Sequence, residues 1–173
     1  MVGITISLSP DHNKTDINPK LLEQLGRITV QWARIEFLLF VEIQNLLARP
    51  EIRNQVEIHE PQISTERRIR QWKTLNKIFF KDSTSESEAI DRFVSHLLGD
   101  MHYRHDLIHS FWDGRGGPTE IKFGIVNVRK GKSTWQRLTI TETTLDEFLE
   151  KLMKRYTFLI NVQLALLTTK VGD

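Results

Sequence analysis

The chain has 173 residues, which suits a single domain over residues 1–173 that is large enough to bury its own hydrophobic core. Hydrophobic residues make up 39% of it and charged residues 27%, as in soluble globular proteins. The absence of cysteine excludes disulfides, cysteine-ligated metal sites and cysteine nucleophiles. A formal net charge of +2 is too small to indicate a nucleic-acid-binding protein by itself.

The N-terminal residues lack a basic region followed by a long apolar run, so we expect no secretory signal peptide. The most apolar window, residues 35–47, is too short to cross a bilayer and contains Glu36 and Glu42, which we expect to be partners of buried cations. We therefore expect a cytoplasmic protein with no membrane partner. Residues 1–18 are expected to form an extended N-terminal segment, because apolar residues alternate near its start.

Residues 21–48 are expected to form the first helix. Apolar residues recur there at three- and four-residue spacing, at Leu25, Ile28, Trp32, Ile35, Leu39, Ile43 and Leu46. Asn18 suits the cap of this helix and Pro19 its first turn. Phe37 and Phe40 widen the apolar stripe beyond what one neighbouring helix covers. The additional face could contact another helix of the same chain or a second subunit.

A second helix is expected to begin at Ser64 or Thr65. Its inner face consists of the apolar residues Ile69, Trp72, Leu75 and Phe79. Much of its remaining surface is basic, with Arg67, Arg68, Arg70, Lys73 and Lys77. These five residues could bind RNA phosphates, although a charged helix face is also the ordinary way to keep a helix solvated.

A third helix is expected to begin near Ser85 or Ser87. One stripe along it contains Ile90, Phe93, Val94, Leu97, Met101, Arg104 and Ile108. A cation such as Arg104 on an apolar stripe needs a partner. A subunit interface, or a carboxylate such as Glu36 or Asp100, would supply one.

The glycine-rich stretch 114–118 is expected to end the third helix. Beyond it the apolar residues alternate with a period of two, at Ile121, Phe123 and Ile125. This pattern predicts a β-hairpin over residues 119–140, with its turn at Arg129-Lys130-Gly131-Lys132.

A last helix is expected to begin at a capping box that pairs Thr143 with Asp146, or Thr144 with Glu147, and to extend to about Thr169. Long helices that are joined by short connections usually form an up-and-down bundle. The sequence therefore predicts a mainly α fold, an up-and-down four-helix bundle with a β-hairpin inserted before the last helix.

The stretch Arg104-His105-Asp106-Leu107-Ile108-His109, near the end of the third helix, is the strongest candidate for chemistry. Arginine is a permanent cation that can hold a phosphate, and histidine can give or take a proton near neutral pH. Together they are a minimal set for phosphodiester chemistry without a metal. A second pair, Arg53 and His59, lies between Pro50 and Pro61 in an expected interhelical loop, and we interpret it as coincidental.

This stretch resembles the signature of the HEPN superfamily of small α-helical domains, which is an Arg, then a polar residue, and a His four to six residues after the Arg. Here these positions are Arg104, His105 and His109. The family also commonly has a Trp followed by an acidic position and bulky apolar residues on its first helix, which is similar to residues 32–39. The similarity covers about residues 21–112 and the final helix.

The resemblance implies a metal-independent endoribonuclease without a cofactor, in which two subunits form one composite cleft, so a homodimer is expected. Arg104 would bind the scissile phosphate and stabilise the transition state. His109 would be the general base or acid for attack by the ribose 2′-OH, which leaves a cyclic phosphate. His105 occupies a position that is more often Asn, and its role stays open: a positioning group, a second proton carrier, or neither. A toxin or defence effector with a neutralising or regulatory protein partner would fit such an activity.

Residues five apart on an ideal helix differ by about 140° in direction. Arg104 and His109 can therefore serve one site if the helix loosens near its end, if the long Arg side chain reaches round, or if residues of two subunits combine.

Other interpretations remain open. His102, His105 and His109, with Asp106, have a spacing compatible with metal ligands on one helical face, but no second element stands out as a source of further ligands. The chain could instead be a non-catalytic HEPN-like module that binds RNA, a nucleotide or a protein. It could also be a dimeric helical interaction protein.

Overall fold

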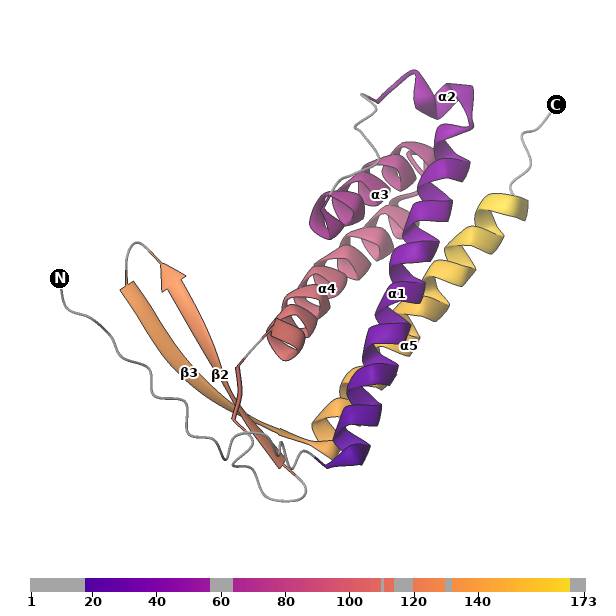
Figure 1. Cartoon of the computed structure of the whole chain (residues 1–173). Helices are drawn as coiled ribbons and strands as arrows, with labels where there is room; N and C mark the ends of the chain where they lie inside the picture. Colours follow the sequence, from indigo (N-terminus) through magenta and orange to yellow (C-terminus); the bar gives the residue numbers. More distant parts are fainter. Residues whose placement is uncertain (1–17, 57–63, 110, 114–119, 130–131, 169–173) are drawn as a thin grey trace.

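The computed structural model describes residues 18–56, 64–109, 111–113, 120–129 and 132–168 (Figure 1). Their elements follow the order α1 (Pro19–Leu47), α2 (Pro50–Arg53), α3 (Thr65–Phe79), α4 (Thr84–His109), β1 (Phe111–Asp113), β2 (Glu120–Arg129), β3 (Lys132–Thr141) and α5 (Glu142–Thr168). The predicted bundle of helices is thus present, and none of the described helices has the length and apolarity needed to cross a membrane. Residues 1–17 of the predicted extended segment, His59, Pro61, the stretch 114–118 and the centre of the hairpin turn lie outside the described residues.

Capping side chains fix where the long helices begin. The Asn18 side chain accepts a hydrogen bond of 2.9 Å from the backbone N–H of Lys20, as predicted. Helix α5 begins with a capping box in which Thr141 and Thr144 each accept a bond from the other's backbone N–H, at 3.2 and 2.9 Å. The prediction that Thr143 or Thr144 opens this box is therefore wrong, because Thr144 stands at its third helical position.

Helices α1 and α5 run in the same direction. Lys20 and Gln24, which are four residues apart on α1, bind Glu142 and Asp146, which are four residues apart on α5. Helix α3 rises in this direction too, and α4 runs in the opposite direction beside α3 (Figure 1). The arrangement differs from the predicted up-and-down order, because α1 and α3 run in the same direction: Thr65 of α3 binds Glu36, and Trp72 binds Glu42 further along α1.

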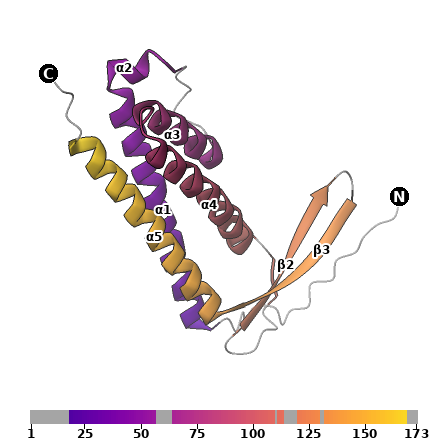
Figure 2. The same cartoon turned by 180° about the vertical axis from the view of Figure 1, so that it is seen from behind.

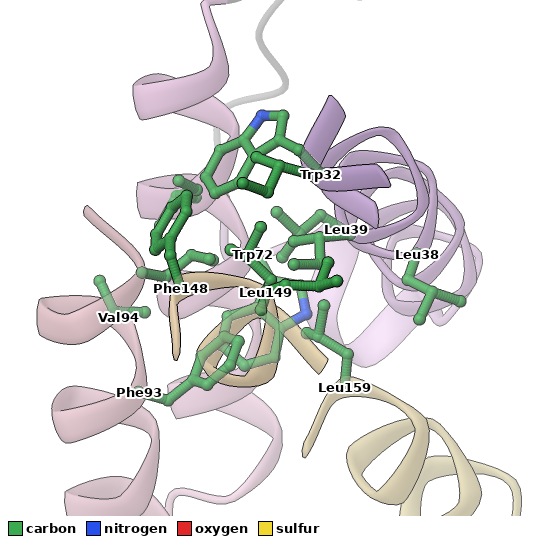
Figure 3. Packing of buried hydrophobic residues seen from close by; sticks show 14 of the residues in the cluster. Trp32, Leu38, Leu39, Trp72, Phe93, Val94, Phe148, Leu149 and Leu159 are labelled. Carbon is green, nitrogen blue, oxygen red and sulfur yellow. The ribbon is translucent and has the colours of Figure 1, made fainter. Parts of the chain in front are cut away.

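One hydrophobic core joins the four long helices. Trp32 of α1, Trp72 of α3, Phe93 of α4 and Phe148 of α5 meet between the helices (Figure 3). The ring of Phe93 lies 5.3 Å from that of Trp72 and stacks at 4.4 Å on Phe158. Burial of each large apolar side chain stabilises the fold by about 1.5–3 kcal/mol, so this cluster fixes α4 against its neighbours.

An antiparallel sheet in the order β1-β2-β3 extends away from the lower end of the bundle (Figure 2). Strands β2 and β3 pair from Glu120 with Thr141 to Arg129 with Lys132, which confirms the predicted hairpin. Strand β1 pairs with β2 and was not predicted, because three residues are too few for a period of two to be seen. Helix α4 therefore leads almost directly into the sheet.

Candidate functional site

The predicted catalytic residues lie in the last two turns of α4, at the end that leads into the sheet (Figure 1). Leu107 is fully buried there, and Tyr103 packs edge-on against Phe148 of α5, with ring centroids 4.7 Å apart. Burial, and to a smaller extent the charge of Glu147, raises the pKa of Tyr103, so this phenol stays neutral. These contacts hold the end of α4 against α5 and fix the directions of the polar residues between them.

His105 and His109 form a pair of exposed imidazoles. Their ring centroids are 4.6 Å apart and their planes are inclined by 46°. They meet because residues four apart lie on the same side of a helix. Two imidazoles at this distance can supply one proton acceptor and one proton donor near neutral pH. The structure thus brings together two of the three predicted catalytic residues.

Arg104 is partly buried, and its Nε is buried with no hydrogen-bond partner among the described residues. The two carboxylates that we expected as partners are bound elsewhere: Asp100 accepts from Arg155 Nε at 2.8 Å, and Glu36 accepts from Thr65 Oγ1 at 2.6 Å. The prediction that one of them neutralises Arg104 is therefore wrong. A guanidinium cannot lose its charge, so Arg104 keeps a donor that a bound anion or a second subunit could satisfy.

One chain does not bring Arg104 and His109 to a common face. Helix α4 is regular through His109, so it does not loosen in the way that a shared face would require. Within the described part of the chain, no contact joins the guanidinium to the imidazole of His109. Of the explanations that the sequence left open, a longer reach of Arg104 or a combination of two subunits remains.

The five basic residues predicted to bind RNA divide into two groups on α3. In the first group, Arg70 pairs with Glu66 at 2.7 Å, while Lys73 and Lys77 both pair with Asp91 of α4, at 2.7 and 2.9 Å. Hydrogen bonds from Lys73 and then from Lys77 lower the pKa of the Asp91 carboxyl, so it stays ionised. The three cations of this group are thus already paired within the chain, which makes them weaker candidates for RNA contacts.

The second group, Arg67 and Arg68, forms no ion pair among the residues that the structure describes. Both arginines lie in the first turns of α3. Arg70 lowers the pKa of Glu66 most, and the charge of His102 on α4 lowers it further. This end of α3 therefore lies near the second half of α4. The two unpaired arginines therefore lie toward the end of the bundle that carries the imidazole pair.

The alternative of a metal site at His102, His105 and His109 gains no support from the geometry. Across the described ranges, no three His, Asp or Glu side chains come close enough together to hold a metal ion. His105 and His109 alone supply two ligands, and a zinc site needs at least three from the protein. The imidazoles and the guanidinium are therefore the groups at this end of α4 that can take part in chemistry.

Sequence reasoning misses a buried polar contact between α1 and α3. Glu42 is fully buried, and its Oε2 accepts a hydrogen bond of 2.5 Å from Trp72 Nε1. The prediction that Glu42 pairs with a cation is therefore wrong, because its partner is a neutral indole. The signal that could have found it is its position on the apolar stripe of α1, beside Ile43 and one turn from Leu39 and Leu46.

A groove of about 390 Å³ lies between α1 and α5, away from the imidazole pair. Its lining consists of Val30, Ala33, Arg34, Phe37, Leu38 and Tyr156. Phe37 is 64% exposed and Phe40 is 44% exposed. The described part of the chain therefore leaves uncovered the second apolar face that the sequence predicts on α1.

Comparisons of the chain with models of protein families, with curated proteins and with solved structures find no match. The resemblance to HEPN domains therefore rests on the residues of the Arg104 motif and of the first helix. The geometry at the end of α4 is the basis on which a function can be proposed.

Proposed function

We propose that the chain is a HEPN-like, metal-independent endoribonuclease that acts as a homodimer, in the manner of a toxin or defence effector. The observation that carries this proposal is the pair of imidazoles, His105 and His109, on the same helix end as Arg104, whose buried Nε has no partner among the described residues. These groups offer proton transfer and charge stabilisation, which are the two kinds of help that RNA cleavage through the 2′-OH uses.

In the proposed reaction, His109 removes the proton of the ribose 2′-OH while this oxygen attacks the adjacent phosphorus. The bond from phosphorus to the 5′-oxygen breaks, and the leaving oxygen receives a proton from an imidazolium. The product is a 2′,3′-cyclic phosphate. His105 lies 4.6 Å from His109 and is a candidate for this acid. Arg104 binds the non-bridging oxygens, on which negative charge increases in the transition state.

Two chains are needed in this proposal, because Arg104 and His109 point about 140° apart on one regular helix. In a symmetric dimer the same patch of both chains meets, so Arg104 of one chain could approach His109 of the other. The exposed imidazoles of His105 and His109, on the same helix end as Arg104, place this contact at the end of α4. Light scattering of the purified protein measures this oligomeric state directly.

Arg67 and Arg68 are the basic residues that we assign to the RNA backbone. They form no ion pair among the described residues and lie in the first turns of α3, the end near the second half of α4. Arg70, Lys73 and Lys77 contribute less in this proposal, because RNA would have to displace their carboxylate partners.

The test is an RNA-cleavage assay with the purified protein in EDTA. Arg104→Ala and His109→Ala should each lower the rate at least about 100-fold. The matched control is His102→Ala, which removes an exposed imidazole of the same helix from outside the pair and should keep the wild-type rate. Cleavage that is unchanged in both Arg104→Ala and His109→Ala would remove the assigned roles.

A second candidate function is a non-catalytic module that binds RNA, a nucleotide or a protein. The observation that favours it is the absence of any contact between Arg104 and His109 within the described part of one chain. RNA binding that weakens with salt, without any cut product from the wild-type protein, would support this candidate over the nuclease. A neutralising or regulatory protein partner is compatible with either proposal.

A further inference from the structure

The carboxyl group of Glu42 lies in the hydrophobic core where α1 faces α3. Glu42 has no exposed surface, and Leu39, Ile43 and Leu46 on the same side of α1 are buried with it. A carboxylate in such a position loses the hydration that stabilises its charge, and it needs a cation or several donors in compensation.

Few hydrogen-bond donors reach this carboxyl. Trp72 Nε1 donates to Oε2, while the buried Oε1 has no partner among the described residues. Asn76, one turn further along α3, is also fully buried; its amide donates to the carbonyl of Trp72 at 3.0 Å, and its Oδ1 has no partner. Two acceptors from facing helices thus lack a donor, and a proton on Glu42 would supply one.

No cation compensates a charge on Glu42 within the described residues. On α3, Lys73 and Lys77 pair with Asp91, and Arg155 of α5 binds a carboxylate of α4. Burial therefore dominates and raises the pKa of Glu42 from 4.5 to about 8, and the hydrogen bond from the indole opposes this only in part.

We propose that Glu42 is an uncharged carboxylic acid that joins α1 to α3, and that loss of its proton in alkaline solution loosens this contact. In the acid form, Oε2 accepts from Trp72 Nε1 and Oε1 can carry the proton. In the ionised form, a charge lies in the core with one hydrogen-bond donor. Because α3 also packs on α4, the loosening extends to the helix that carries the imidazole pair.

The direction of the pH effect follows from the protons that each state binds. In the unfolded chain Glu42 ionises near pH 4.5, whereas in the folded chain it keeps its proton up to about pH 8. Between these values the folded state holds more protons, so stability falls as the pH rises, and the unfolding equilibrium constant increases about tenfold per pH unit. Below pH 4.5 and above about pH 8, the contribution of Glu42 to the free energy of unfolding does not change with pH.

The experiment compares urea unfolding of the wild-type protein and of Glu42→Gln at a series of pH values. Gln keeps the shape of the side chain and an acceptor for Trp72, but it does not titrate. The ratio of the unfolding constants, wild type over variant, should rise about tenfold per pH unit up to about pH 8 and then level. A ratio that does not change with pH overturns the proposal.

Glu36→Gln is the matched control, because Glu36 lies on the same helix and also contacts α3, through Thr65, but is partly exposed. The unfolding equilibrium constant of this variant should depend on pH as that of the wild type does, between pH 4.5, where Glu42 ionises in the unfolded chain, and about pH 8, where it ionises in the folded chain. Loss of that dependence in Glu36→Gln, with its retention in Glu42→Gln, would assign the titration to the wrong carboxyl and overturn the proposal.

A direct measurement does not depend on any variant. In ¹³C NMR of the wild-type protein, the side-chain carboxyl of Glu42, assigned through the backbone, should titrate near pH 8. A midpoint near 4.5 contradicts the proposal. Trp72→Phe removes the donor that favours the ionised form, so the midpoint should move to a higher pH in this variant. A lower midpoint in Trp72→Phe also contradicts it.

Discussion

Among the described residues, the side chains of Glu42 and Arg104 each bury a polar atom without a partner, and they differ in how that atom can be satisfied. Glu42 Oε1 lies in the core between α1 and α3, whereas Arg104 Nε lies near the end of α4. A carboxyl can take up a proton and become neutral, but a guanidinium keeps its charge. Glu42 can therefore be stabilised by taking up a proton, while Arg104 keeps its charge and is a candidate for binding an anion or a second subunit. A buried polar atom without a partner thus marks a contact that is proposed to depend on pH at Glu42, and a candidate binding group at Arg104.

The largest effect is expected from Arg104→Met, which keeps the apolar stem and removes the guanidinium. RNA cleavage should fall about 100- to 1000-fold, because the phosphate loses its cationic donor. The free energy of unfolding should stay constant or rise by up to about 1 kcal/mol, because an unsatisfied buried donor is gone. Cleavage assays and urea unfolding on the same preparation separate the two results. A variant that keeps its cleavage rate but loses stability would show that Arg104 is structural.

An intermediate effect is expected from Arg155→Met, which frees the carboxylate of Asp100. Asp100 and Arg104 lie four residues apart on α4, so the freed carboxylate can then pair with the guanidinium along the helix. This pairing should draw Arg104 from the phosphate and lower RNA cleavage about tenfold. The control is Arg92→Met, which removes an arginine of the same helix from its exposed pair with Glu88 and should not change the rate. Full activity in Arg155→Met would contradict this use of Arg104.

The smallest effect is expected on RNA affinity from the basic face of α3. Arg67→Gln and Arg68→Gln should each weaken binding several-fold and lower the slope of log affinity against log salt by about 1. Lys73→Gln and Lys77→Gln, the matched controls, should change both quantities less, because their charges already pair with Asp91. Fluorescence anisotropy over a range of salt concentrations measures both. If the lysine variants lose as much RNA affinity as the arginine variants, ion pairing within the chain does not decide which basic residues contact RNA.

The helices could be predicted from the sequence because their core faces are a local property. Trp32, Trp72, Phe93 and Phe148 all lie at apolar positions of a helical period, and all are buried. The direction of α3 could not be predicted in this way. It depends on contacts such as Trp72 with Glu42 of α1 and Lys77 with Asp91 of α4, whose partners lie on other helices.

Less of the candidate site could be predicted. The approach of His105 and His109 follows from their spacing on one helix. The partners of charged residues do not, because they come from other helices: Asp100 binds Arg155, which is 55 residues away. Such pairings depend on which helices become neighbours, and no local pattern contains that information.

In the proposed dimer, Arg104 of one chain and His109 of another act on the same phosphodiester bond. Mixing Arg104→Ala protein with His109→Ala protein tests it most directly, because a mixed dimer keeps one guanidinium and one imidazole that face each other across the interface. Each variant alone should be inactive in EDTA, and cleavage should return in the mixture. A mixture that stays as inactive as the separate variants, beside an active wild-type protein, would contradict it.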